Sequence, residues 1–128
     1  MKNINDLLQM SLPMLMLVPP PKRLDEQMIS NLANFGEAVR LCVKERVSGL
    51  TQAQIAKYLG FSNPHFTKVL QSKAYLSSDQ ISILERLCSN KAISQYQERV
   101  NATVAEAVET PDQKIARLQE ELRLARAA

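Results

Sequence analysis

Basic and polar side chains suited to binding a polyanion are concentrated between residues 40 and 76. Six Lys or Arg residues fall in this stretch against one acid, Glu45, although the 128-residue chain has a net charge of only +3. The six are Arg40, Lys44, Arg46, Lys57, Lys68 and Lys73. Positive charge gathered in one part of a nearly neutral chain is typical of a nucleic-acid-binding surface. Charge alone leaves a plain solvated basic face open as the alternative.

The sequence offers little for catalysis or metal binding. His65 is the only histidine, and no carboxylate or thiol stands near it at the spacing of metal ligands. Cys42 and Cys88 lack CxxC spacing and fall within apolar helical patterns, so we expect small core residues in a reducing compartment. A glycine loop that could cradle phosphates is also missing. We therefore predict no enzyme, no metal and no cofactor.

The elements that must position the basic residues are helices. An apolar stripe with spacings of three and four predicts one helix over residues 25–49, capped by Asp25 and ended by Gly49. Its stripe is Met28, Leu32, Phe35, Val39 and Cys42. Further helices are predicted from Ser78 to about Cys88 and from about Ile93 through Val104. Alternating strand patterns are missing, so the sequence predicts an all-α fold.

Two short helices lie inside the basic stretch, on either side of a glycine. Thr51 caps the first, and Gly60 ends it. Ser62 or Asn63 caps the second, and Pro64 falls in its first turn, where the missing N–H costs nothing. Two helices of about eight residues cannot each bury much alone. We therefore expect them to cross steeply and pack together through a tight turn at Gly60.

This pair resembles the helix-turn-helix of the Cro and phage-repressor family, also called lambda-repressor-like or XRE domains. The positions that carry the resemblance are Gln52, Ala56, Gly60, Phe66 and Val69. The resemblance covers roughly residues 25–100 and implies a compact bundle of about five helices that binds double-stranded DNA. The chain departs from the family pattern at Phe66, where Ile or Val is commoner, and by having Pro64 in the recognition helix. An α-helical hairpin that binds no DNA is the alternative.

The resemblance also implies which residues contact DNA. Helical periodicity turns Phe66, Val69 and Leu70 inward and Lys68 and Gln71 outward, and in this family the start of the second helix enters the major groove. The candidate base contacts are Asn63, Pro64, His65, Thr67 and Lys68. The candidate phosphate contacts are Gln52, Lys57, Gln71, Ser72 and Lys73. Lys44 and Arg46 are better explained as a solvated face than as DNA contacts. For His65, a plain exposed histidine without a role stays open as the alternative.

Segments on both sides of the predicted domain, residues 23–109, fall outside the resemblance. Residues 1–22 form an apolar, Pro-rich arm. Three roles are open for it: packing on a partner subunit, binding another protein, or a disordered terminus. Residues 110–128 predict a helix that begins with a Thr110–Gln113 capping box. Its apolar positions Ile115, Leu118, Leu122 and Ala125 occupy a and d of two heptads, with Glu121 at g and Arg126 at e. Self-association through this helix and packing on its own domain are both open.

Together these features predict a cytoplasmic, DNA-binding transcriptional regulator of prokaryotic or phage type, acting as a homodimer or higher oligomer. The apolar stretch of residues 7–18 is too short to span a bilayer and is broken by Pro13, so we expect no membrane association. A plasmid centromere- or origin-binding adaptor with the same motif is one alternative. A protein-interaction scaffold that binds no DNA is another.

Overall fold

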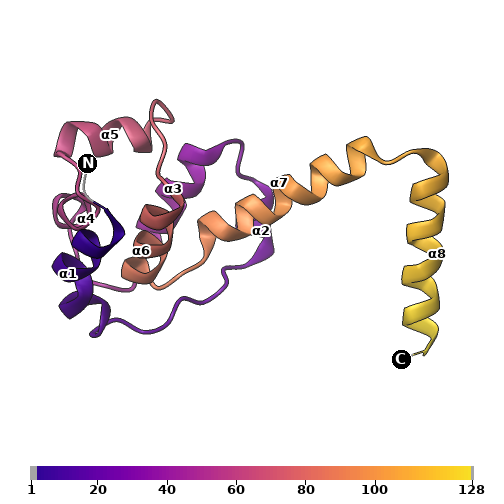
Figure 1. The fold of residues 1–128 in the computed structure, drawn as a ribbon, viewed down its shortest axis with the longest axis horizontal. Coiled ribbons are helices and arrows are strands. Elements are labelled where there is room, and N and C mark those ends of the chain that lie inside the picture. Colours follow the sequence, from indigo (N-terminus) through magenta and orange to yellow (C-terminus); the bar gives the residue numbers. More distant parts are fainter. Residues whose placement is uncertain (1–2, 128) are drawn as a thin grey trace. The chain divides into compact units, whose positions relative to one another are not determined.

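The computed structural model describes residues 3–127, which form eight helices and no strand, so the predicted all-α class is confirmed (Figure 1). The helices are α1 (Ile4–Leu15), α2 (Glu26–Ser30), α3 (Phe35–Lys44), α4 (Gln52–Tyr58), α5 (Asn63–Leu70), α6 (Ser78–Cys88), α7 (Ala92–Val108) and α8 (Pro111–Ala127). None of these helices is long and apolar enough to cross a membrane.

The chain divides into two compact units. The first unit runs to Tyr96, and the second begins at Gln97. The first therefore holds α1 to α6 and the start of α7, and the second holds the rest of α7 and all of α8. This boundary lies inside α7, whereas the sequence places one between residues 109 and 110.

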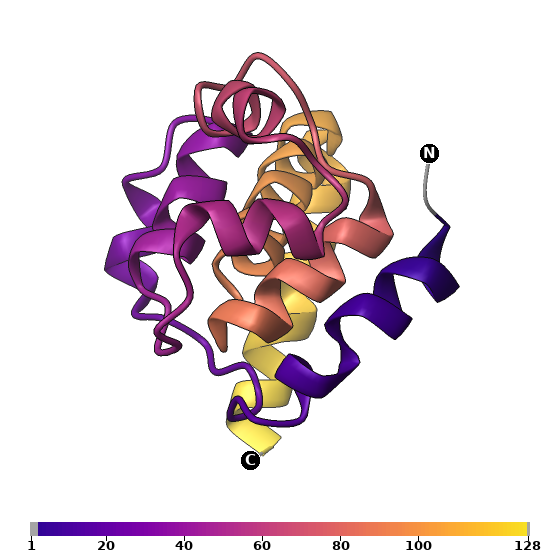
Figure 2. The ribbon, with the colours of Figure 1, turned by 90° about the vertical axis from the view of Figure 1, so that its left-hand side faces the viewer.

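The core of the first unit is built where α3 packs against α5 and α6, and α4 packs against α5. Its largest fully buried apolar side chains come from four helices and the turn after α4: Ile29, Ile55, Leu59, Leu84, Leu87 and Ile93. The helix α4 is seen nearly end-on in Figure 1 and lengthwise in Figure 2, whereas α5 is seen the other way round. The two helices therefore cross steeply, as the sequence predicts.

The prediction of a single helix over residues 25–49 is wrong, because the structure has two helices there. Asp25 does cap α2 by accepting a hydrogen bond from the Gln27 N–H at 2.9 Å, but α2 ends at Ser30. Asn34, in an extended conformation, then caps α3 by accepting from the Glu37 N–H at 2.9 Å. An asparagine side chain that binds nearby backbone competes with the helix. α3 also ends at Lys44, before Gly49.

The helix ends around Gly60 agree with the sequence. Thr51 and Gln54 form a complete capping box at the start of α4. Ser62, rather than Asn63, caps α5 by accepting a hydrogen bond from the His65 N–H at 3.3 Å, and Pro64 lies in the first turn. Gly60 has a φ of 79°, in the left-handed region that residues with a Cβ rarely adopt. The turn that separates α4 from α5 therefore requires glycine.

Replacing Gly60 with valine should lower the free energy of unfolding by about 1–2 kcal/mol or more, because a β-branched residue is strained at this φ. Thermal and denaturant unfolding of the two proteins measure the difference. Gly49→Val is the matched control, since Gly49 is exposed, does not have a positive φ, and a Cβ there would meet nothing within 4 Å. An equal decrease in the free energy of unfolding in the two variants would contradict a strained turn at Gly60.

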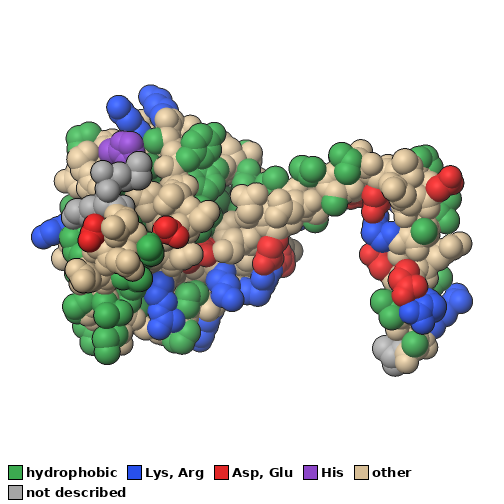
Figure 3. Space-filling view, viewed as in Figure 1, with side chains coloured by type: hydrophobic (Ala, Val, Ile, Leu, Met, Phe, Trp, Pro, Cys, Tyr) green, Lys and Arg blue, Asp and Glu red, His purple; other side chains and the backbone are tan. Residues whose placement is uncertain are grey.

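The N-terminal segment forms a helix that shares the core of the first unit. α1 packs against α6 and α4, and it buries Leu7, Ser11 and Leu15 (Figure 2). Of the predicted arm, residues 3–22 are therefore part of the folded unit, and residues 1 and 2 lie outside the described chain. The side of α1 away from the core, with the residues that follow it, is apolar and exposed, and hydrophobic side chains gather there in Figure 3. A protein partner for this side stays a prediction.

The chain between α1 and α2 is held to the link between α6 and α7, and to the start of α7, by hydrogen bonds. The Lys22 N–H donates to the Ser89 carbonyl at 3.2 Å, and the Lys91 N–H donates to the Lys22 carbonyl at 3.0 Å. The buried Gln95 amide accepts from the Leu24 N–H at 2.8 Å and donates to the Leu24 carbonyl at 2.9 Å. These bonds satisfy the extended backbone that follows the three prolines.

Candidate nucleic-acid interface

The exposed face of α5 carries all five predicted base-contact residues. Phe66 is 2% exposed and Val69 is fully buried, whereas Leu70 is half-buried. The buried face of α5 is therefore close to the predicted one. The five exposed residues are Asn63, Pro64, His65, Thr67 and Lys68. The side chains of Asn63 and Lys68 make no hydrogen bond or ion pair with any residue between 3 and 127. Their polar atoms are therefore available to an outside partner.

The five residues do not point the same way. Asn63 and Thr67 line a hollow of about 230 Å³ between α4 and α5, which Gln52 also lines. The Thr67 hydroxyl donates to the Asn63 carbonyl at 3.0 Å, which fixes its rotamer. His65 lies on the other side of α5, where its ring packs on Phe61 with the centroids 4.6 Å apart. His65 is therefore separated from the pair that faces α4.

Four of the five predicted phosphate-contact residues are exposed. These are Gln52, Lys57, Gln71 and Lys73. The fifth, Ser72, is half-buried, and its hydroxyl donates to Asn34 Oδ1 at 2.9 Å. Asn34 thus holds the loop after α5 and caps α3 at the same time. In Figure 3, Lys and Arg side chains project near the single histidine at this end of the first unit.

A second hollow, of about 470 Å³, adjoins the first and gathers positive charge. Arg40, Lys44 and Arg46 line it together with Gln52 and Leu70, and the last two also line the first hollow. The sequence favours a solvated face for Lys44 and Arg46, and it names Arg40 as part of the basic stretch without an individual contact. The structure instead brings all three beside Gln52. The spacing of Arg40 and Lys44, four residues apart on one helix, is the signal that could have indicated a shared face.

The two guanidinium groups in this hollow are held in place, whereas the lysine is free to move. Arg46 donates to the Val43 and Leu50 carbonyls, each at 2.6 Å. Arg40 donates to the Leu70 carbonyl and lies 4.0 Å from the Glu37 carboxylate. The exposed Lys44 makes no hydrogen bond or ion pair with the described residues. Arginines fixed by backbone carbonyls next to a mobile lysine can bind phosphate oxygens at little cost in side-chain entropy.

The loop after α5 approaches α3 so closely that only glycine fits at position 36. A Cβ on Gly36 would lie 1.9 Å from Ser72 Oγ. Ser72 itself has a φ of 65°, in the left-handed region. This contact fixes the loop that carries Lys73, and no local pattern around residues 36 or 72 indicates it.

We predict that Gly36→Ala lowers the free energy of unfolding by about 1–3 kcal/mol, the usual cost of overpacking. Ser72→Gly removes the clashing Oγ and Cβ but leaves the backbone nitrogen of residue 72 at 2.8 Å from the new Cβ, so Gly36→Ala should cost less in that background but still destabilise. Denaturant unfolding of the four proteins in this double-mutant cycle measures the coupling. An equal cost of Gly36→Ala in both backgrounds would show that the Ser72 side chain does not meet the new Cβ.

The cysteines belong to the core, as predicted. Cys42 and Cys88 are both fully buried and free. A hydrogen bond with Cys88, together with burial, raises the pKa of the Cys42 thiol well above its usual value. Thiols with a raised pKa and no access to solvent are poor nucleophiles.

In the second unit, the predicted apolar seam of α8 is accessible. The Thr110–Gln113 capping box is present, with hydrogen bonds of 3.0 and 3.2 Å. No described residue of α8 is buried, and Ile115, Leu118 and Leu122 are each about half exposed. Arg117 binds Glu109 at 2.7 Å and Glu121 at 3.1 Å, and these carboxylates raise the pKa of the guanidinium. The charged side chains thus pair along α8 and leave its apolar side chains without cover within this unit.

No family model, no curated protein and no solved structure matches this chain. The assignment of function therefore rests on the site itself.

Proposed function

We propose that this chain is a sequence-specific DNA-binding regulator that acts through a helix-turn-helix formed by α4 and α5. The observation that carries the proposal is the continuous polar and cationic surface around Gln52. On one side of Gln52 lie the unbonded Asn63 and the exposed Thr67 of α5, and on the other lie Arg40 and Lys44 of α3. A positioned helix flanked by cations is what reading DNA requires, because phosphate contacts set the register and base contacts read the sequence.

The contacts divide by chemistry. Asn63 offers an amide that can pair bidentately with adenine, and Lys68 offers a donor for guanine. Pro64 and the Thr67 methyl can touch a thymine methyl. Phosphates would be bound by the exposed residues around them: Gln52, Lys57, Gln71 and Lys73. We add Arg40 and Lys44 to this group, because they share a hollow with Gln52.

We further propose that two copies associate through α8. One such domain offers few base contacts, and joining two makes the second binding event effectively intramolecular. A parallel pairing through Ile115, Leu118 and Leu122 would cover the half-exposed seam, with Ala125 as the last d position. In that arrangement Glu121 can exchange its bond with Arg117 for one with Arg126 of a second copy. The expected protein is a dimeric regulator of prokaryotic or phage type working in the cytoplasm, with no enzymatic activity.

Selection of bound fragments from a pool of random duplex DNA tests this function. Enrichment of a near-palindromic sequence is expected, because a symmetric dimer presents its two reading helices to related half-sites. The selection should be run with the full chain and with a variant in which Asn63, Thr67 and Lys68 are all alanine. If no sequence is enriched by the full chain, or the same sequence is enriched by the variant, α5 does not read DNA.

A further inference from the structure

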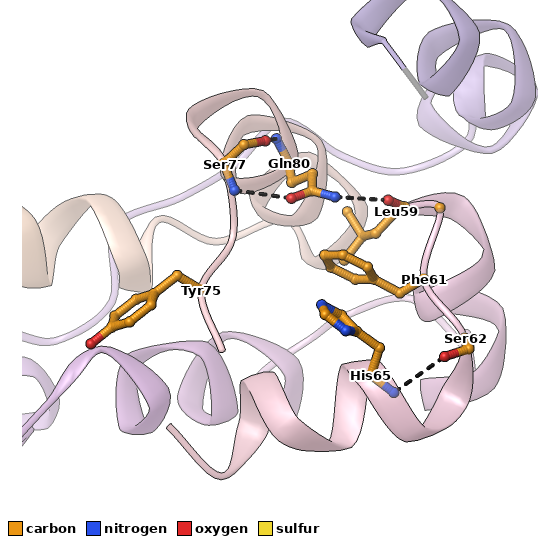
Figure 4. A pocket seen from close by; sticks show the side chains of 8 residues that line it. Leu59, Phe61, Ser62, His65, Tyr75, Ser77 and Gln80 are labelled. Carbon is orange, nitrogen blue, oxygen red and sulfur yellow. Dashed lines mark hydrogen bonds between the residues drawn. The ribbon is translucent and has the colours of Figure 1, made fainter. Parts of the chain in front are cut away.

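A separate hollow of about 500 Å³ lies on the His65 side of α5 (Figure 4). The turn at Gly60 and the start of α5 form one side of it, and the segment from Tyr75 to Gln80 forms the other. Gly60 has no side chain to fill the opening. The volume is within the range of about 300–1,000 Å³ that is usual for small-molecule sites.

One wall of this hollow is aromatic. The ring of His65 lies against that of Phe61, with centroids 4.6 Å apart and planes inclined by 36°. Figure 4 shows the His65 ring pointing into the space, with Tyr75 at the far end of it and the Tyr75 hydroxyl directed away from His65. Tyr75 is 74% exposed and rests on Phe35 at a centroid distance of 5.5 Å. A flat ring system can therefore stack on the Phe61–His65 wall.

The polar side of the hollow is rigid. Gln80 donates to the Leu59 carbonyl at 3.1 Å and accepts from the Ser77 N–H at 2.9 Å, so its amide is held from both ends. The Ser77 hydroxyl accepts from the Gln80 N–H at 3.2 Å and keeps its own hydrogen to donate. The ring nitrogens of His65 make no hydrogen bond with residues 3–127. The site thus offers donors and acceptors that the protein does not use itself.

The lining contains no Lys, Arg, Asp or Glu side chain. A charged ligand would lose its hydration there without gaining an opposite charge, so the hollow favours a neutral one. We propose that it binds a neutral, planar heteroaromatic molecule, stacked on His65 and Phe61 and hydrogen-bonded at its edge to His65 or Ser77. This site is separate from the surface around Gln52, and the inference does not depend on DNA binding.

Titration of the isotope-labelled full chain with indole, quinoline, adenine and cytosine, each alone and without DNA, tests the proposal by nuclear magnetic resonance. We expect at least one of these probes to give saturable shifts in the backbone signals of Phe61, Ser62, His65 and Tyr75. His65→Ala should weaken its binding about five- to tenfold, the usual effect of losing one stacking partner. Phe61→Leu should weaken it similarly while keeping most of the apolar volume.

Thr67→Ala is the matched control, because Thr67 lies on the same helix but lines the hollow on the opposite side. It should leave binding of the probe unchanged. The amide spectra also report whether each variant is folded, so a loss of binding can be separated from unfolding. The inference is overturned if none of the four probes gives saturable shifts at these residues. It is equally overturned if folded His65→Ala and Phe61→Leu chains both bind as tightly as the parent.

Discussion

Leu122→Asp should lower the affinity of the full chain for its selected DNA site by about 10²-fold or more, because avidity between linked domains contributes about 10²–10⁴. Leu122 occupies the second a position of the seam and is 51% exposed in the single chain, so aspartate would place a charge in the proposed dimer contact. Deleting residues 111–128 should have the same effect. The first unit should still fold, because its core lies before Tyr96.

Leu124→Asp is the matched control. Leu124 is 55% exposed on the same helix but falls at heptad position c, away from the seam. Light scattering should show a dimer for the parent and for Leu124→Asp, and a monomer for Leu122→Asp, with gel-shift affinities following the same order. A dimer that survives both Leu122→Asp and the deletion would mean that the contact lies elsewhere. The exposed side of α1 and the Tyr96–Val104 part of α7 would then be the next places to examine.

Asn63→Ala should cost about 1–3 kcal/mol at one base pair of each half-site and leave the other positions nearly unchanged. The reason is that its amide makes no bond within the described chain and lies in the first turn of α5. Affinities for duplexes substituted at each position in turn measure this pattern.

Lys73→Ala should behave differently, because a phosphate contact carries no sequence information. It should weaken selected and random duplexes alike and reduce the dependence of affinity on salt. Identical profiles for Asn63→Ala and Lys73→Ala across all sequences would show that the direction assigned to α5 is wrong.

Local signals in the sequence were sufficient for the helix pair at the centre of the molecule. The Thr51 cap, the glycine at position 60 and Pro64 each specify their own backbone within a few residues, so no distant contact is needed to place them. The same holds for Thr110 and Gln113. The inward face of α5 followed from the spacing of Phe66 and Val69 for the same reason.

Features that depend on contacts between distant residues could not be obtained in this way. The apolar residues from Met28 to Cys42 keep their helical spacing across the break at Asn34. The spacing therefore predicts one helix where the structure has two. Asn34 is held there partly by Ser72, 38 positions away. The packing of α1 and the gathering of Arg40, Lys44 and Gln52 likewise depend on how helices meet, which a single sequence does not reveal.

The dependence of DNA affinity on salt tests the central claim most directly. Fluorescence anisotropy with the selected duplex and a scrambled one should be measured with the full chain over a range of salt concentrations. In each copy four cations are assigned to phosphates, namely Arg40, Lys44, Lys57 and Lys73. A bound dimer therefore has eight, and the logarithm of affinity should fall against that of salt with a slope of about −7. The selected duplex should bind at least about 10³-fold more tightly than the scrambled one. A chain that binds neither duplex at low salt, or binds both equally with no dependence on salt, would contradict a DNA-reading function and favour a protein scaffold.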